Sequence, residues 1–352
     1  EQHPGRAVYQ SHCATCHDRP EETRARSLDV LRAYDASRVA IALSEGSMKA
    51  FGDQLTREQF RDVVSYLAGA SASNSDWEAA NRCPASVAPV DTTAPIAANG
   101  FGFDLENRRF LSTEASGLDL DDLSRLELAW VLAFPDTTMM RSQPVIVGNT
   151  LFVSPVETQA LYAFDVSGTP CLQWVYRSDR QLRTSLSFGR LPGSDRAILV
   201  LGDSAARVHA VDAASGEGLW IADLKRFPEQ IVTGTPQVVA GRVYATVSQF
   251  EISVGAQSEH VCCKSHGAVA ALDGITGKII WRTPMLPDAT PQRDRGDGQM
   301  IWGPSGAPVW TSPAIDLQRG VLYVGTGEAT SEPAHPHTDA IVALDLDTGK
   351  VR

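Results

Sequence analysis

The chain has 352 residues, of which 43% are hydrophobic and 21% are charged, and its formal net charge is −11. This length suggests about two globular domains. The negative charge argues against binding to nucleic acid or to an anionic membrane surface, and no apolar run has the length of a membrane-spanning helix. We therefore expect an acidic globular protein with no nucleic-acid partner and no membrane span.

Residues 13–17 read Cys-Ala-Thr-Cys-His, the Cys-x-x-Cys-His signature of covalent haem c attachment. Two thiols at this spacing can each form a thioether with a haem vinyl group, and the adjacent histidine then reaches the iron. Zinc sites and redox dithiols also contain Cys-x-x-Cys. A zinc ribbon needs a second ligand pair nearby, and a redox dithiol normally follows a strand; neither is expected here. The motif predicts haem c attached to Cys13 and Cys16, with His17 as an iron ligand.

A methionine follows in a glycine-containing loop, residues 44–51, and we expect this Met48 to be the second axial ligand of the iron. The competing interpretation is that Met48 fills the core. A helix should follow the loop, because Thr56 and Gln59 form a capping box before residues that share one helical face: Phe60, Val63, Val64 and Leu67. Haem motif, methionine loop and closing helix are typical of a class I cytochrome c. We therefore expect a small all-α cytochrome c domain over residues 1–70.

Residues 71–99 are rich in Ala, Ser, Asn and Pro, which predicts a linker. After residue 100 one unit recurs: a strand ending in Ala-x-Asp, a turn ending in Ser-Gly or Thr-Gly, and then a tryptophan. The turns are Asp165–Gly168, Asp212–Gly216, Asp273–Gly277 and Asp345–Gly349, and the first three lead to Trp174, Trp220 and Trp281. Apolar strands are expected before them at residues 151–154, 197–202, 242–247 and 321–325.

This unit has a physical explanation: the aspartate caps the turn, the glycine takes a positive φ, and the tryptophan packs against the neighbouring unit. Repeats of this size predict propeller blades, and a β-sandwich is the alternative. The spacing between the aspartates grows along the chain, so the third and fourth blades should carry insertions that build a binding face. Four blades do not close a ring of the usual size, and we expect a truncated propeller over residues 100–352.

The repeat resembles the tryptophan-docking unit of the quinoprotein alcohol dehydrogenases. With the haem motif at the amino end, the whole chain resembles the cytochrome-containing polyvinyl-alcohol dehydrogenases. The similarity includes residues 100–104 with Asn107 and Arg109 at the start of the propeller, and residues 311–316 and 322–327. The resemblance implies a mainly β fold, an eight-bladed propeller of which about half is present, with pyrroloquinoline quinone (PQQ) and calcium on its axis.

The resemblance also implies calcium ligands. Ser248-Gln249-Phe250-Glu251 matches a family segment that ends in a calcium-binding glutamate, with Ser248 close to the cofactor. Residues 325–328 match a segment in which the family usually has asparagine as the second ligand, and this chain has Glu328 instead. For Glu251, a carboxylate at the end of a strand is a poor structural choice unless a cation or another partner neutralises it, and a surface-loop carboxylate is the alternative. Glutamate can also bind calcium at position 328, but its extra negative charge would change how strongly the metal attracts electrons.

Three groups are expected around the quinone. Trp310 matches the family's indole that supports one face of the ring system, with a core tryptophan as the alternative. Cys262 and Cys263 are adjacent, so a disulfide between them closes a strained eight-membered ring. In quinoprotein dehydrogenases such a disc covers the second face of PQQ; two free or separately paired thiols are the alternative.

Arg183, with Thr233 or Thr235, is a candidate for binding the carboxylates of PQQ, since arginine pairs with carboxylates in a bidentate manner. A surface salt bridge is the competing interpretation for Arg183. Cys83 and Cys171 are the cysteines left over, and we expect them to form a structural disulfide that pins the linker to the first blade.

The function implied is PQQ- and haem c-dependent oxidation of alcohols, with the secondary alcohols of polyvinyl alcohol as expected substrate. Electrons would pass to haem c and then to an external acceptor such as a cytochrome. The cysteine usage and the haem motif predict a periplasmic protein whose signal peptide has been removed, and the catalytic base is expected beyond Arg352. The alternatives are a dehydrogenase for another alcohol or a sugar, and a non-catalytic propeller that carries an electron-transfer haem.

Overall fold

The computed structural model describes residues 3–34, 36–68, 74–135, 137, 139–194, 196–255 and 260–352. The chain divides into two compact units, residues 1–81 with 133–138 and residues 82–132 with 139–352. The expected boundary between a cytochrome domain and a linker, at residues 70 and 71, lies outside the described residues. None of the helices in the described ranges combines the length and the apolar character needed to cross a membrane.

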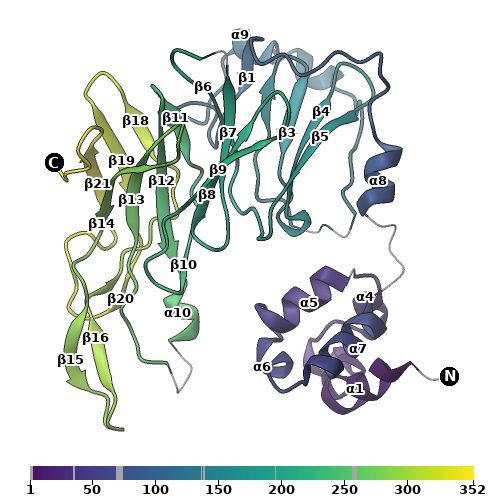
Figure 1. The fold of residues 1–352 in the computed structure, drawn as a ribbon, viewed down its shortest axis with the longest axis vertical. Helices are drawn as coiled ribbons and strands as arrows, with labels where there is room; N and C mark the ends of the chain where they lie inside the picture. The colour runs from purple at the N-terminus through teal and green to yellow at the C-terminus, as the bar shows by residue number, and fades with distance from the viewer. Residues whose placement is uncertain are drawn as a thin grey trace. The chain divides into compact units, whose positions relative to one another are not determined.

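The first unit is all helical (Figure 1). Its helices are α1 (Pro4–His12), α2 (Ala14–His17), α3 (Pro20–Thr23), α4 (Leu28–Arg32), α5 (Ala36–Ser44), α6 (Lys49–Gly52), α7 (Arg57–Leu67) and α8 (Asn74–Ala80). The predicted capping box begins α7: the Thr56 hydroxyl accepts a hydrogen bond from the Gln59 N–H, and the Gln59 side chain accepts one from the Thr56 N–H. Helices α1 and α7 pack closely at Gly5, where any side chain would overlap the Asp62 carbonyl.

The second unit contains four consecutive antiparallel sheets, the blades (Figure 1). The first has β1 (Ile96–Ala98), β2 (Val145–Val147), β3 (Thr150–Val153), β4 (Ala160–Asp165) and β5 (Cys171–Arg177); the second has β6 (Ser187–Arg190), β7 (Ala197–Gly202), β8 (Arg207–Asp212) and β9 (Gly218–Asp223). The third has β10 (Gln230–Ile231), β11 (Gln237–Val239), β12 (Arg242–Gln249), β13 (Ala268–Asp273) and β14 (Ile279–Pro284); the fourth has β18 (Ala314–Asp316), β19 (Val321–Gly325) and β21 (Ile341–Asp345). Strand pairs follow the chain in a meander, as when Val145 lies opposite Phe152. The four predicted strands correspond to β3, β7, β12 and β19.

Consecutive blades are joined by the predicted tryptophan–glycine contacts. Gly277 of the third blade has a φ of +71°, and a Cβ atom there would lie 2.6 Å from the ring of Trp220 in the second blade. The Trp220 Nε1–H donates to the Gly274 carbonyl at 3.1 Å. The same contact joins Trp174 to the turn of the second blade and Trp281 to that of the fourth. In each turn the aspartate accepts hydrogen bonds from residues two or three further on, as predicted.

A buried polar network also connects the first two blades. Asp203 and His209 are fully buried, and His209 Nε2 lies 3.0 Å from an Asp203 carboxylate oxygen. The other ring nitrogen of His209 lies 2.8 Å from the hydroxyl of Tyr176 in the first blade. Burial raises the pKa of Asp203, but hydrogen bonds from His209 and Arg207 more than offset it, so the pKa lies below the usual range for aspartate.

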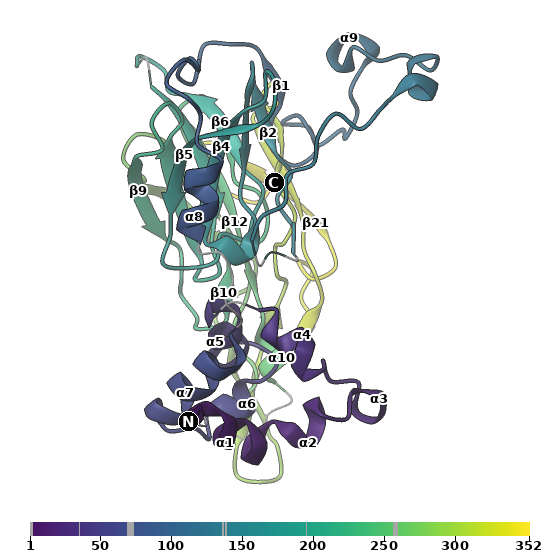
Figure 2. The ribbon, with the colours of Figure 1, turned by 90° about the vertical axis from the view of Figure 1, so that its right-hand side faces the viewer.

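The remaining elements are insertions and connections. The chain of the first blade contains three short helices. The helices α9 (Thr113–Ser116) and η1 (Asp122–Arg125) lie between β1 and β2, and η2 (Val156–Thr158) lies between β3 and β4. The segment with α9 extends away from the sheets (Figure 2). The third blade carries α10 (Glu251–Val254) between β12 and β13. Before the fourth blade come the hairpin of β15 (Thr290–Asp294) and β16 (Met300–Gly303), and then β17 (Ser305–Gly306). Strand β17 pairs with β20 (Ala329–Ser331), which follows β19 in the chain. Insertions therefore fall in the third and fourth blades, as expected, and the long segment between β1 and β2 of the first blade is an insertion that was not expected.

Candidate functional site

The haem motif lies at the start of the first unit. His17 ends α2, and its Nδ1–H donates to the Arg26 carbonyl at 2.6 Å, which assigns the proton to Nδ1 and leaves Nε2 as the nitrogen with a free lone pair. Cys13 is partly buried and Cys16 is exposed, and both thiols are free. Burial raises the pKa of the Cys13 thiol. This imidazole orientation and two free thiols on one helical turn fit covalent haem attachment.

The core of the same unit is only partly closed. Its fully buried part consists of Val8, Tyr9, Val39, Leu43, Val63 and Leu67. A larger set of apolar residues packs against this core but stays partly exposed, and it includes Cys13, Leu28, Leu31, Met48 and Phe60. Apolar side chains left half-exposed around the motif suit a large planar cofactor that would cover them. Met48 is in this set, so its role as an iron ligand remains a prediction.

The second unit contains a cavity of about 610 Å³. Half of the residues that line it come from the segment just before one strand of each blade: Arg141 before β2, Arg183 and Ser185 before β6, Thr233 and Thr235 before β11, and Trp310, Thr311 and Ser312 before β18. Because equivalent segments of successive blades face the same axis, residues far apart in sequence are brought together. Four predicted PQQ ligands, Arg183, Thr233, Thr235 and Trp310, line this one cavity.

The cavity is strongly positive. Arg109, Arg141 and Arg183 line it, and no acidic side chain does so in the described part of the chain. Burial lowers the pKa of Arg183, and the nearby Arg141 lowers it further, although an arginine remains charged at neutral pH. Such an arrangement favours a ligand that carries several negative charges.

Several buried polar atoms at the cavity have no hydrogen-bond partner: Nε of Arg183, Oγ1 of Thr233 and Oδ1 of Asn107. Buried polar groups are normally paired, so these atoms indicate a polar ligand. Trp310 lines the cavity and is 49% exposed. Gly327 packs against its indole so closely that a Cβ atom at position 327 would clash with the ring. An exposed indole beside unpaired cations fits a flat, anionic, aromatic molecule such as PQQ.

Five other predicted ligands do not line this cavity: Ser248, Glu251, Cys262, Cys263 and Glu328. Ser248 is buried on β12, opposite Ile231. Cys262 and Cys263 form the predicted disulfide, as do Cys83 and Cys171. Their position relative to PQQ remains a prediction.

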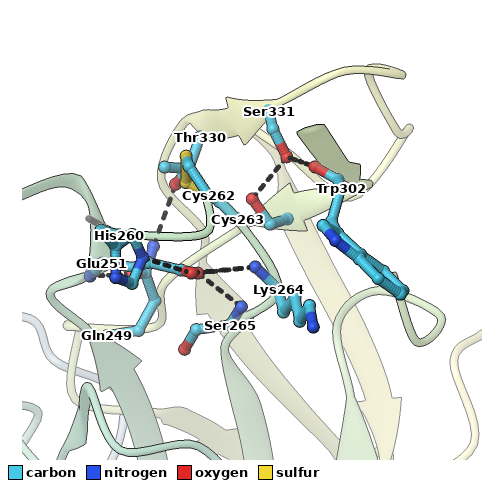
Figure 3. Close-up of a disulfide and its surroundings, with 11 residues drawn as sticks. Gln249, Glu251, His260, Cys262, Cys263, Lys264, Ser265, Trp302, Thr330 and Ser331 are labelled. Atoms are coloured by element: carbon cyan, nitrogen blue, oxygen red, sulfur yellow. Dashed lines mark hydrogen bonds and ion pairs between the residues drawn. A yellow bond between two sulfur atoms is a disulfide. The ribbon is translucent and has the colours of Figure 1, made fainter. Parts of the chain in front are cut away.

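The carboxylate of Glu251 is enclosed by nitrogen donors (Figure 3). It accepts hydrogen bonds from the N–H groups of Lys264 and Ser265, and Nε2 of His260 lies 3.0 Å from one of its oxygens. Calcium takes six to eight oxygen ligands. Ligand atoms of Glu251, His260 and Cys263 lie within 4.8 Å of one another, and Glu328 is not in this group. The donors around Glu251 therefore do not fit calcium.

Three residues of the cavity were not predicted as ligands: Asn107, Arg109 and Arg141. Arg141 lies shortly before β2 as Arg183 lies shortly before β6, so aligning the blades on these strands would have indicated it. Asn107 and Arg109 lie outside the repeat; the family resemblance included them as part of the start of the propeller, without a ligand role.

Comparisons with known proteins agree with this architecture. The family model described as "Glucose/ethanol/alcohol dehydrogenase, beta-propeller domain", a PQQ family, matches residues 99–352, and the model described as "Cytochrome C oxidase, cbb3-type, subunit III" matches residues 1–67. The chain is 29% identical to a polyvinylalcohol dehydrogenase of Pseudomonas sp. over 99% of its length, and 30% identical to one of Sphingopyxis sp. (strain 113P3) over 100%. In both cases it spans 56% of the relative's length.

Solved structures give the same fold. The crystal structure of quinohemoprotein alcohol dehydrogenase from Comamonas testosteroni matches with a TM-score of 0.54 and 21% identity, covering 80% of this chain and 44% of that one. A europium-containing methanol dehydrogenase matches with a TM-score of 0.54 and 20% identity, covering 73% and 48%. The predicted partial quinoprotein propeller with a cytochrome domain before it is therefore confirmed. The chain belongs to the PQQ family of glucose, ethanol and alcohol dehydrogenase β-propellers and carries a cytochrome domain at its amino end.

Proposed function

We propose that this chain is part of a periplasmic dehydrogenase that oxidises alcohols with PQQ and haem c. The observation that carries the proposal is the cavity lined by three arginines and no described acidic residue, with Trp310 exposed beside it. When bound, PQQ supplies an electron-accepting quinone for alcohol oxidation and haem c supplies a one-electron carrier.

The chain's own residues would bind and orient the quinone. Arg183 and Arg141 would pair with its carboxylates, and the hydroxyls of Thr233 and Thr235 would donate hydrogen bonds to them. Trp310 would stack on one face of the ring system. We keep Cys262–Cys263 as the proposed surface for the opposite face. The contacts with Arg183 and Thr233 would pair buried polar atoms that otherwise have no partner, so ligand binding offsets a cost already present in the protein.

In the first unit, Cys13 and Cys16 would carry the haem, and His17 would bind its iron through Nε2. The hydrogen bond from Nδ1 to Arg26 keeps the ring oriented and increases the basicity of Nε2. Met48 is proposed as the second iron ligand, and methionine–histidine ligation would raise the reduction potential of the iron, which suits an electron acceptor. The electrons would leave to an external acceptor such as another cytochrome.

The proposed substrate class is the secondary alcohol of polyvinyl alcohol. Relatives named polyvinylalcohol dehydrogenase match along the whole chain. Side chains at the cavity also suit a hydrocarbon backbone, since Phe101, Tyr323 and Ile341 line it and are exposed, Ile341 by 83%. We assign no catalytic base, and no step is derived through calcium.

Two measurements test the proposal with the haem-loaded chain. PQQ is first titrated into the protein while tryptophan fluorescence is followed; binding should quench it, and Trp310→Phe should weaken the quenching. Reduction of haem is then followed after adding polyvinyl alcohol, a small secondary alcohol or glucose. Haem reduction by polyvinyl alcohol in the presence of PQQ supports the proposal. PQQ binding without haem reduction by any of the three would favour a non-catalytic propeller, and the absence of PQQ binding would refute the cofactor site.

A further inference from the structure

The loop that carries the Cys262–Cys263 disulfide is held from both sides by one buried carboxylate. Glu251, the first residue of α10, is 2% exposed. One of its oxygens lies 3.0 Å from Nε2 of His260, which precedes the cysteines in the chain. Both oxygens accept hydrogen bonds from the N–H of Lys264, which follows them, at 2.8 and 3.0 Å, and one also accepts from the N–H of Ser265. Glu251 therefore contacts the loop on each side of the disulfide.

The far side of the loop is hydrogen-bonded to β16, which contains Trp302. The Cys263 N–H donates to the Trp302 carbonyl at 3.3 Å, and the Trp302 N–H donates to the Cys262 carbonyl at 2.9 Å. The Lys264 ammonium lies 3.8 Å from the centre of the Trp302 ring. These contacts are backbone hydrogen bonds and one partly buried cation, so the buried carboxylate is the strongest acceptor that the loop has.

We infer that Glu251 is a positioning residue that fixes the Cys262–Cys263 loop, with His260 as its side-chain partner. An ionised carboxylate has about four acceptor sites, and the contacts with His260, Lys264 and Ser265 occupy most of them. Cys263 is bonded to Cys262, so its sulfur is not available as a metal ligand and the group of three is not a metal site. The inference does not depend on PQQ, calcium or an alcohol.

The consequence is measurable as protection of the disulfide. Without the carboxylate, the N–H groups of Lys264 and Ser265 lose their acceptor, and the loop should open more often. The haem-loaded chain is treated with a water-soluble phosphine and an alkylating reagent in buffer that contains a calcium chelator, and labelling of Cys262 and Cys263 is followed by peptide mass spectrometry. Haem loading removes Cys13 and Cys16 from the reaction, because both become thioethers.

Glu251→Ala should increase the labelling rate of the pair at least tenfold. Glu251→Gln, which keeps one acceptor oxygen, and His260→Ala should each give a smaller increase. The Cys83–Cys171 disulfide in the same molecule is the internal control, and its labelling rate should not change. Glu217 is exposed, so Glu217→Ala should change the labelling rate of neither disulfide.

Unchanged labelling of Cys262 and Cys263 in Glu251→Ala, with Cys83–Cys171 still protected, would overturn the inference. If Glu251→Ala unfolds the protein and so exposes both disulfides, the inference is tested with Glu251→Gln and His260→Ala instead. Unchanged labelling rates of Cys262 and Cys263 in both of these variants would also overturn the inference. Because neither PQQ nor substrate is present, failure of the proposed function would leave this result unaffected.

Discussion

The contact between Trp220 and Gly277 allows a quantitative test of how the blades are joined. In Gly277→Ala the new methyl group meets two obstacles: a φ of +71° and the Trp220 ring, which lies 2.6 Å from the position that the alanine Cβ would take. A left-handed conformation costs a non-glycine residue about 1–2 kcal/mol. Forcing an extra carbon into a packed contact costs about 1–3 kcal/mol more. We expect the free energy of unfolding to fall by about 2–5 kcal/mol.

Gly320→Ala is the matched control. Gly320 has a φ of +64°, and no atom lies within 4 Å of the position that a Cβ would take there, so only the conformational cost of about 1–2 kcal/mol applies. The effect of alanine on the unfolded chain is the same for both variants and cancels. Urea unfolding of the two, followed by tryptophan fluorescence, should differ by about 1–3 kcal/mol. Equal losses of stability would refute the tryptophan–glycine contact as a connection between blades.

Other sites give three more predictions. Asp203→Asn should lower the free energy of unfolding by about 3–5 kcal/mol, because Arg207 and His209 then lose the buried carboxylate that they contact. The pKa of Asp203 is lowered in the folded protein, so its contribution is present above the ordinary pKa of aspartate and is lost as the pH falls through the folded value. As the pH falls, the free energy of unfolding of the wild type should therefore decrease more steeply than that of Asp203→Asn. An equal decrease for both proteins, measured by urea unfolding at a series of acidic pH values, would contradict this. Met48→Ala should abolish the methionine–iron charge-transfer band of the oxidised haem; its survival would exclude that ligand. Arg183→Ala should weaken PQQ binding by about tenfold or more in a fluorescence titration, since a charged hydrogen bond contributes about 1.5–3 kcal/mol, whereas the exposed Arg319→Ala should bind PQQ as wild type does.

The blade architecture could be predicted because its signals are local and repeated. A turn such as Asp273–Gly277 needs a capping carboxylate and a residue with positive φ, and both requirements are visible in the sequence. The partner of each tryptophan follows from the repeat, since a contact made between two blades is made again between the next two. The capping box of α7 was predictable for the same reason.

The surroundings of the candidate site were less predictable, because they depend on which loops meet in space. The residue type of Glu251 indicated a buried negative charge that needs a partner, but the sequence could not show whether that partner is a cation or a set of N–H groups. His260 lies nine positions further along the chain, and only the folded loop brings it to the carboxylate. Arg109 and Arg141 were not predicted as ligands, because a charge on a loop has no periodicity that indicates its direction.

The cavity and the blades are specified by different residues. The blades are joined by their Asp–Gly turns and tryptophans, whereas none of these residues lines the cavity, half of whose lining precedes β2, β6, β11 and β18. A substitution at the cavity therefore leaves the tryptophan–glycine contacts between blades intact. Such a division lets a lineage exchange one ligand-contacting side chain at a time and test new substrates without first acquiring compensating stability.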